Sequence, residues 1–146
     1  MRGVFSGGPM LLYRFGRKFH LLGFVRLGKV VTFLNRIVFA TVVPCSANIG
    51  RGTVVGYAGL GVVIHSAAVI GERVHICQNV TIGRNPEREG VPVIEDDVYV
   101  GPGAVVSGNI RIGRGARIGA NAVVLKDIPA GAVAVGVPAR VLNAEE

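Results

Sequence analysis

Two side chains in the stretch "GYAGLGVVIHSAAVIG" (residues 56–71) are of types that could move a proton or stabilise a developing charge. His65 carries an imidazole with an ordinary pKa of about 6.5, so it suits a general base at neutral pH. Tyr57 has an ordinary pKa of about 10 and suits hydrogen-bond donation to an oxyanion or to a bound acceptor. A glycine-rich break separates them, and such irregular segments often lie near functional sites. We therefore take both as candidate catalytic residues.

The element that positions these side chains is indicated by a six-residue spacing of aliphatic residues. A period of six fits neither an isolated helix nor a two-sided strand. It is typical of a solenoid in which each hexapeptide forms one short strand and one corner. The predicted fold is therefore an all-β, parallel β-helix over residues 46–128, with inward-facing aliphatic columns. These columns consist of Ile49, Val55, Ile64, Ile70, Ile76, Ile82, Ile94, Val100, Val106, Ile112, Ile118 and Val124.

Two steps in this spacing depart from six. Val55 and Ile64 are nine residues apart, which predicts a three-residue insertion at the glycine-rich break, so that Tyr57 and His65 flank one bulge. A later step of twelve residues keeps the phase and predicts a loop. The residue after the aliphatic one is often glycine. We expect this glycine to relieve crowding at the corner and to adopt a positive φ.

The remaining histidines and the cysteines have simpler interpretations. His75 directly precedes an inward-facing isoleucine, so we expect it on the outer surface of the β-helix, where it either meets the next subunit and could act in catalysis or faces only solvent. His20 lies in a basic segment near the N-terminus, and we expect it at the surface. Cys45 and Cys77 lack CxxC spacing, which favours two buried thiols in a reducing cytoplasm over a disulfide or a zinc site. No metal site is predicted. The two candidate catalytic residues have a structural alternative as well, in which they only shape and pack the corners.

Residues 1–45 differ from the rest of the chain in charge. They contain seven basic residues and no acidic one, so the whole net charge of +7 lies in this segment. Its apolar residues predict short helices. Two interpretations stay open: basic helix faces exposed to solvent, or a segment lying on an anionic membrane surface with its apolar side down. At the other end, Pro129 and Pro138 predict that coiling stops and that residues 129–146 form a tail that folds back.

Four segments of the repeat carry a family resemblance: "AVIGERVHICQNVTIG", "VPVIEDDVYVGPGAVVSGNIRIG", "ARIGANAVVLKDIPAG" and "AVGVPARVL". They resemble the hexapeptide-repeat acyltransferases, and within them the serine acetyltransferase branch and its relatives in polysaccharide gene clusters. The resemblance implies a left-handed β-helix and a homotrimer with active sites between neighbouring subunits. It also implies acetyl-CoA as co-substrate and transfer of the acetyl group to a hydroxyl by general-base catalysis.

The same resemblance implies which residues line the acetyl-CoA groove. Small residues there let the thin pantetheine arm lie against the backbone, and cations suit the phosphates of CoA. The implied groove residues are Gly83, Arg84, Asn85, Pro102, Ala120, Lys126 and Arg140.

The sequence departs from the serine acetyltransferase pattern at the catalytic positions. Those enzymes carry an Asp–His pair on the coil that matches "VVGYAG", where this chain has Gly56 and Tyr57. They carry a second His in the loop that matches "RNPEREGVPVI", which contains none. The expected acceptor is therefore a hydroxyl of either serine or a sugar in a polysaccharide precursor. A non-catalytic β-helix scaffold is a further alternative, whereas a zinc-dependent carbonic anhydrase of the same fold is disfavoured by the spacing of His65 and His75.

Several classes of protein are disfavoured by what the sequence lacks. It has no run of 18 uncharged apolar residues, the length that would suggest a membrane-spanning helix, and no signal-peptide pattern. No recognition motif accompanies the basic charge, so no nucleic-acid partner is expected. We expect a cytoplasmic protein, with peripheral contact at the inner face of the membrane if residues 1–45 bind lipid.

Overall fold

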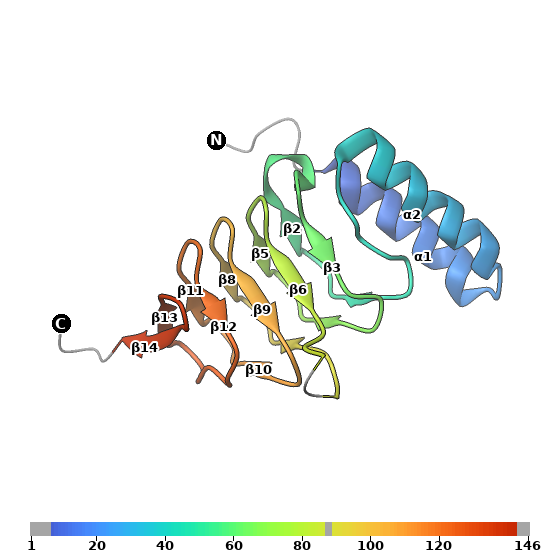
Figure 1. Ribbon diagram of the computed structural model, residues 1–146. Coiled ribbons are helices and arrows are strands. Elements are labelled where there is room, and N and C mark those ends of the chain that lie inside the picture. Colours follow the sequence, from blue (N-terminus) through green and yellow to red (C-terminus); the bar gives the residue numbers. More distant parts are fainter. Residues whose placement is uncertain (1–6, 87–88, 143–146) are drawn as a thin grey trace.

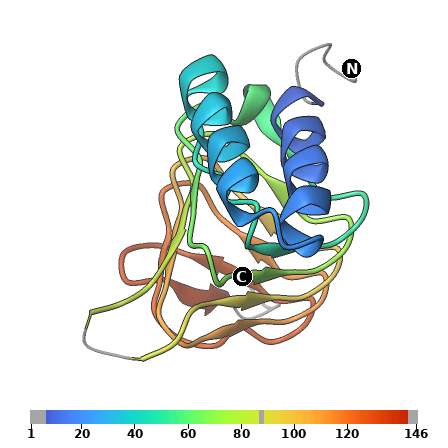
Figure 2. The same ribbon diagram turned by 90° about the vertical axis from the view of Figure 1, so that its right-hand side faces the viewer.

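The computed structural model describes residues 7–86 and 89–142, and consists of two helices followed by a three-sided parallel β-helix, which we call the prism (Figure 1, Figure 2). The helices are α1 (Gly8–Leu21) and α2 (Val25–Phe39), and a 3-10 turn, η1 (Gly56–Gly59), interrupts the first coil. Face 1 contains β1 (Asn48–Ile49), β4 (Val69–Ile70), β7 (Val93–Ile94) and β10 (Arg111–Ile112). Face 2 contains β2 (Val54–Val55), β5 (His75–Ile76), β8 (Tyr99–Val100), β11 (Arg117–Ile118), β13 (Val133–Val135) and β14 (Arg140–Leu142). Face 3 contains β3 (Val63–Ile64), β6 (Thr81–Gly83), β9 (Val105–Ser107) and β12 (Val123–Val124).

The predicted aliphatic columns form the core of the prism. On face 1, Ile70 pairs in register with Ile49 on one side and Ile94 on the other, and the other faces repeat this stacking. Every member of the columns is buried except Ile49 in the first coil, which is half-buried. The register is strongly specified because a one-residue slip would turn these side chains out to solvent. The prediction of an all-β parallel β-helix after a short helical segment is confirmed.

The glycine that follows the aliphatic residue relieves crowding, as predicted. A Cβ on Gly71 would lie 2.7 Å from the backbone nitrogen of Asp96 in the next coil, so a larger residue would push the coils apart. The predicted positive φ was wrong, because the left-handed residue of each turn comes two positions later. Glycine, asparagine and aspartate prevail there since they tolerate this conformation. The residues are Gly52, Arg73, Asn79, Asp97, Gly103, Gly115, Asn121 and Gly131.

The two helices form a hairpin across the N-terminal end of the prism (Figure 2). Gly23, with a φ of 88°, allows the tight turn between them. The hairpin is fixed to the first coil by the buried Tyr13, whose hydroxyl donates to the carbonyl oxygen of Ala47 at 2.7 Å and accepts from the backbone N–H of Ile49 at 3.1 Å. Burial raises the pKa of Tyr13. Arg2, part of the predicted basic segment, lies outside the described residues.

The described part of the predicted tail, residues 129–142, extends face 2. Strand β13 pairs in parallel with β11, as a further coil would, and the chain then reverses so that β14 pairs antiparallel with β13. This reversal covers the C-terminal edge of face 2 (Figure 1). Across residues 7–86 and 89–142, neither helix has the length and apolar character needed to cross a bilayer.

Candidate active site

All of the predicted site residues except Arg140, which lies in β14 on face 2, lie at the two edges of face 3. The turns that enter this face from face 2 form the 2–3 corner, and the turns that leave it for face 1 form the 3–1 corner. Tyr57, Pro102 and Ala120 lie at the 2–3 corner, each in the turn before a strand of face 3. The residues at the 3–1 corner end a strand of face 3 or lie one or two positions after it. They are His65, Gly83, Arg84, Asn85 and Lys126.

At the 2–3 corner the three-residue insertion forms η1. Tyr57 and Ala58 are consecutive non-glycine residues in the left-handed region, with φ of 50° and 54°. Such residues cost on the order of 1–3 kcal/mol each, and they cluster where function requires an unusual backbone. The turn presents the Tyr57 side chain to solvent, with 75% of its surface exposed. Tyr57 is therefore available to a ligand or to a neighbouring subunit.

At the 3–1 corner the structure brings His65 next to the predicted groove residues. The backbone N–H of His65 donates to the carbonyl oxygen of Ile82 at 2.8 Å, which places His65 beside Gly83 on the following coil. Arg84 and Asn85 continue from Gly83 into the loop that projects from this corner (Figure 2). A small-residue backbone edge and an imidazole thus share one corner.

Within one chain the structure does not bring Tyr57 and His65 together. They lie at opposite ends of β3, on the two sides of face 3. On a later coil, the chain from Pro102 to Ser107 crosses the same face, and the three extended residues of β9 alone span about 10 Å of it. A small acceptor in contact with one edge is therefore out of reach of the other edge of the same chain.

His65 makes a hydrogen bond that bears on its chemistry. Its Nδ1 accepts from the backbone N–H of Ala67 at 3.1 Å. In a neutral imidazole one nitrogen accepts and the other carries the proton, so this bond leaves the proton on Nε2. In this geometry His65 is half-buried, stabilises its own turn, and offers Nε2 as a hydrogen-bond donor.

His75 belongs to a column of interacting side chains on the outer surface of face 2, as predicted for its position. Its ring stacks on that of Tyr99, with centroids 5.5 Å apart and planes at 26°, and the guanidinium of Arg117 lies 4.8 Å from the Tyr99 ring. Cys77 Sγ lies 3.3 Å from the Tyr99 hydroxyl; this hydrogen bond and burial raise the pKa of Tyr99. A Cβ on Gly56 would lie 3.7 Å from His75 Nε2. The imidazole is therefore adjacent to the residue that precedes Tyr57.

Sequence reasoning did not identify this column, although a signal for it existed. The twelve-residue step between the second and third coils keeps the six-residue phase, so His75, Tyr99 and Arg117 occupy equivalent positions on successive coils. Aligning the sequence by coil would have placed the imidazole, the phenol and the guanidinium in one row.

The described residues provide features that fit acetyl-CoA. Beyond the Cα of Gly83 there is open space, since the nearest atom to a Cβ built there would be Thr81 Cγ2 at 3.8 Å. At the 2–3 corner Gln78 Oε1 is buried and has no hydrogen-bond partner among the described residues, which leaves an acceptor for an amide N–H. Lys126 and Arg140 are exposed cations, and Arg140 lies in β14, whose backbone pairs with β13.

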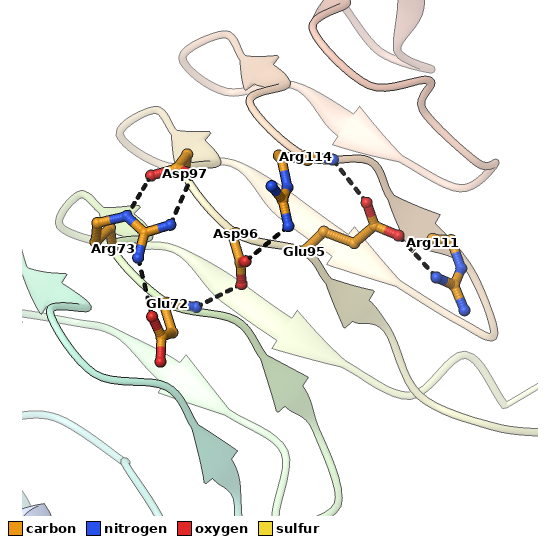
Figure 3. A network of polar contacts seen from close by, with 7 residues as sticks. All are labelled: Glu72, Arg73, Glu95, Asp96, Asp97, Arg111 and Arg114. Carbon is orange, nitrogen blue, oxygen red and sulfur yellow. Dashed lines mark hydrogen bonds and ion pairs between the residues drawn. The ribbon is translucent and has the colours of Figure 1, made fainter.

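The 1–2 corner, between faces 1 and 2, contains none of the predicted site residues and is instead an ion-paired ladder (Figure 3). Arg73 binds Asp97 through two hydrogen bonds of 2.7 and 3.0 Å. The side chain of Arg114 donates to Asp96 at 3.1 Å, and its backbone N–H donates to Glu95 at 2.8 Å. No group of three or more His, Cys, Asp or Glu side chains in the described parts of the chain could hold a metal ion. Cys45 and Cys77 are both buried and free, as predicted.

Comparison with known proteins places this geometry in a family. The family model described as bacterial transferase hexapeptide (six repeats) matches residues 92–126. A serine acetyltransferase from Helicobacter pylori is 38% identical over 136 residues, which cover 92% of this chain and 79% of that protein. Other curated serine acetyltransferases are longer, and the chain spans 47% and 60% of two of them.

Solved structures agree with this placement. Soybean serine acetyltransferase complexed with serine superposes with a TM-score of 0.86 at 37% identity, covering 92% of this chain and 56% of that chain. A serine acetyltransferase in complex with CoA superposes with a TM-score of 0.85 at 32% identity, covering 92% and 55%. The predicted left-handed parallel β-helix is confirmed by these neighbours. The chain belongs to the serine acetyltransferase family of hexapeptide-repeat proteins.

Proposed function

We propose that this protein is an acetyl-CoA-dependent O-acetyltransferase of the serine O-acetyltransferase type. In this reaction the acceptor hydroxyl oxygen attacks the thioester carbon, a base takes the hydroxyl proton, and CoA leaves as its thiol. The observation that carries the proposal is the arrangement of all the implied site residues except Arg140 along the two edges of one face. The relatives solved with serine and with CoA support the same activity.

We propose a homotrimer, because the two edges of face 3 are complementary but separate. The 2–3 corner offers Tyr57 and the unpaired acceptor of Gln78, whereas the 3–1 corner offers His65 and the open backbone at Gly83. A ligand that contacts both sets must lie between two chains, with one corner from each. Cyclic symmetry then repeats this site at every subunit interface.

The acetyl-CoA groove in this proposal runs along those facing corners. Gly83, Pro102 and Ala120 leave room for the pantetheine arm, and Arg84 and Asn85 border it from the loop after β6. The exposed cations Lys126 and Arg140 lie toward the C-terminal end of the prism, where they suit the CoA phosphates.

We propose His65 as the catalytic imidazole, in contact with the reacting atoms through Nε2. As a base, Nε2 must be unprotonated, so the neutral ring would carry its proton on Nδ1 and give up the hydrogen bond from Ala67. If that bond persists, Nε2–H instead donates to the thioester carbonyl oxygen as negative charge develops there. Tyr57 supplies a second donor, from the neighbouring subunit.

His75 is a second candidate for the base, and one observation favours it. Its ring lies beside Gly56 at the corner that presents Tyr57, and its stacking on Tyr99 holds it in place without using its ring nitrogens. In this variant of the mechanism His75 takes the proton and His65 stabilises the oxyanion.

The test is a thiol-release assay with acetyl-CoA, offering serine and a panel of sugars as acceptors. The expected result is release with a hydroxyl acceptor and a loss on the order of 10²–10⁴-fold in kcat/KM for His65→Ala. His75→Ala is the matched variant. If it abolishes the acidic limb of the pH–rate profile while His65→Ala keeps that limb, the base is His75.

Two results would contradict the proposal, each in favour of an alternative. Turnover with sugars but not with serine would assign a polysaccharide precursor as the acceptor. No detectable CoA binding by calorimetry would leave a non-catalytic scaffold.

We propose a cytoplasmic location, peripheral at the inner face of the membrane. The two buried, unpaired thiols suit a reducing compartment. The membrane contact rests on the helical hairpin, because its described cations face no acidic partner within residues 1–45. Fractionation of cells that express the tagged full chain tests this location, and recovery only in an oxidising compartment would contradict it.

A further inference from the structure

The side of the helical hairpin that faces away from the prism carries two matching stripes of side chains. On each helix the stripe members are four, three and four residues apart, so they share one helix face. Each stripe contains three large apolar residues and one cation. The outer stripes are Leu11, Phe15 and Lys18 on α1 together with Leu22, which caps its C-terminal end, and Arg26, Val30, Phe33 and Ile37 on α2.

These apolar side chains are not part of the core. All six are between 53% and 71% exposed. The buried residues of the same helices lie on the opposite side, where Tyr13 and Gly16 of α1 and Val31 of α2 pack toward the prism and the partner helix. Both helices lie side by side over the N-terminal end of the prism, so their outer sides form one end of the molecule (Figure 1, Figure 2). Large contiguous apolar surfaces of this kind mark interaction sites.

The charge around the stripes has a single sign. All acidic residues of the sequence lie at position 72 or later, so the hairpin has none. Lys29 and Arg36 flank the α2 stripe on one side. Beside α1 runs a groove of about 660 Å³, and the lining residues include four cations and no acid. These cations are Arg14, Arg17, Lys18 and Arg51.

We propose that the outer stripes are a docking surface for an anionic lipid membrane. In a symmetric contact with a second copy the same cations would meet one another with no acidic partner, which opposes that pairing. On a membrane, Phe15, Phe33 and Ile37 would instead insert between the acyl chains. Lys18 and Arg26 would extend to the phosphates of the lipid headgroups. The groove beside α1 is lined by cations and would bind the phosphates of further lipid headgroups.

This inference deepens the proposed peripheral location and is independent of the proposed acyl transfer. In a cyclic trimer the three hairpins lie at the same height along the symmetry axis, so all three can meet one surface together. Shared attachment raises the affinity of the assembly far above that of one hairpin.

The test is co-flotation of the full-length protein with vesicles, in the absence of any substrate. Vesicles of phosphatidylcholine with about one third phosphatidylglycerol should bind the protein, and pure phosphatidylcholine vesicles should not. Binding should weaken at least about tenfold when salt rises from about 0.05 M to about 0.5 M, because counterions screen the cations. Salt-insensitive binding, or equal binding to both vesicles, would overturn the proposal.

Two double variants separate the contributions, and each has a matched control on the prism. Phe33→Gln with Ile37→Gln removes apolar contact, and Lys18→Gln with Arg26→Gln should lower partitioning on the order of tenfold. The controls are Val133→Gln and Arg114→Gln, an exposed apolar residue and an exposed cation on later coils, away from the hairpin, which should bind vesicles like the unmodified protein. Unchanged melting temperature and CoA affinity establish that the variants are folded.

Sedimentation equilibrium without lipid tests the alternative that the stripes bind a second copy of this chain rather than a membrane. If the protein forms an assembly that Phe33→Gln with Ile37→Gln splits in two, and anionic vesicles do not bind it, the stripes join copies of this chain and the membrane proposal is wrong. A mass unaffected by the variant, together with vesicle binding that the variant abolishes, supports the proposal.

Discussion

The prism and the hairpin differ in where they place their large apolar side chains. In the prism the large aliphatic residues are buried in columns, each in register with its neighbour on the next coil. In the hairpin the large apolar side chains are mostly exposed. The buried residues of its two helices are Pro9, Met10, Tyr13, Gly16, Gly28, Val31 and Asn35. The prism therefore buries its large apolar side chains, whereas the hairpin leaves many of its own exposed.

The two regions also differ in charge. At the 1–2 corner of the prism, carboxylates and guanidiniums pair along successive coils (Figure 3). The hairpin carries cations only. Substitutions of similar size should therefore have very different effects on stability in the two regions, because the prism residues are buried and the outer hairpin residues are exposed.

The largest expected effect comes from opening the prism core. Ile94 is 1% exposed and lies between Ile70 and Ile112 in the face 1 column. Ile94→Ala should lower the free energy of unfolding by about 2–5 kcal/mol, through lost burial and the cavity left behind. The matched hairpin variant Phe33→Ala, at a side chain 60% exposed, should change it by less than about 0.5 kcal/mol. Urea unfolding of both variants measures the contrast. Equal losses would mean that the exposed hairpin surface is buried in the free protein.

A smaller loss of stability is expected when a glycine is replaced by alanine, and its cause differs between the prism and the hairpin turn. In the prism, a Cβ on Gly71 would lie 2.7 Å from the backbone nitrogen of Asp96, so Gly71→Ala should cost about 1–3 kcal/mol as the coils are forced apart. In the hairpin turn, Gly23 has a φ of 88° and no atom within 4 Å of its Cβ position. Gly23→Ala should therefore cost only the conformational penalty of about 1–2 kcal/mol. Thermal melts distinguish them because Asn, which tolerates positive φ, should rescue position 23 but not position 71.

Most of the fold could be predicted from the sequence, because a six-residue period constrains every coil at once. The inward columns and the crowding at Gly71 both follow from stacking identical units. The position of the left-handed residue could not be assigned from glycine alone, because Asn79, Asp97 and Arg73 occupy it too. All of these residues lie three positions after the inward aliphatic residue, and this common spacing would have predicted the left-handed position.

The candidate site was less predictable, because its residues lie in the irregular turns at the corners, which the six-residue spacing does not determine. Sequence reasoning placed Tyr57 and His65 on either side of one bulge, but did not show that β3 carries them to opposite edges of face 3. Nor could it reveal that Ala67 donates to His65 Nδ1, because a single backbone N–H decides this. The stacking of His75 on Tyr99 requires that the loop between Ile82 and Ile94 preserves the six-residue spacing, so that the two side chains occupy equivalent positions on neighbouring coils.

The junction between the two regions rests on Tyr13. Its hydroxyl bonds both Ala47 and Ile49 at the start of the first coil. Tyr13→Phe keeps the ring but leaves a buried carbonyl and an N–H without their partner, at an expected cost of about 1–3 kcal/mol. Hydrogen exchange should accelerate in α1 and α2 while face 3 stays protected. Uniform acceleration over the whole chain would contradict the view of the hairpin as a separate unit.

The smallest expected effect concerns the ion-paired ladder. The hydrogen bonds from Arg73 hold the pKa of Asp97 below its ordinary value, and those from Arg111 and Arg114 do the same for Glu95. A carboxyl whose pKa is lowered by folding stabilises the protein above its ordinary pKa of about 4, and this contribution is lost as pH falls through the folded-state pKa. These groups are solvent-exposed, so the effect on melting temperature should be modest.

The ladder and the hairpin should therefore respond differently to acid. Asp97→Asn should lower the melting temperature at pH 7, and its difference from the unmodified protein should shrink as the pH falls through the lowered folded-state pKa of Asp97. Arg36→Gln in α2 should produce no such pH-dependent difference, since no carboxylate of the hairpin faces that cation. Melting curves between about pH 3 and pH 7 measure both. A pH-dependent difference for Arg36→Gln as large as that for Asp97→Asn would show that the hairpin cations already have acidic partners in the free protein, and would remove the reason for assigning them to lipid phosphates.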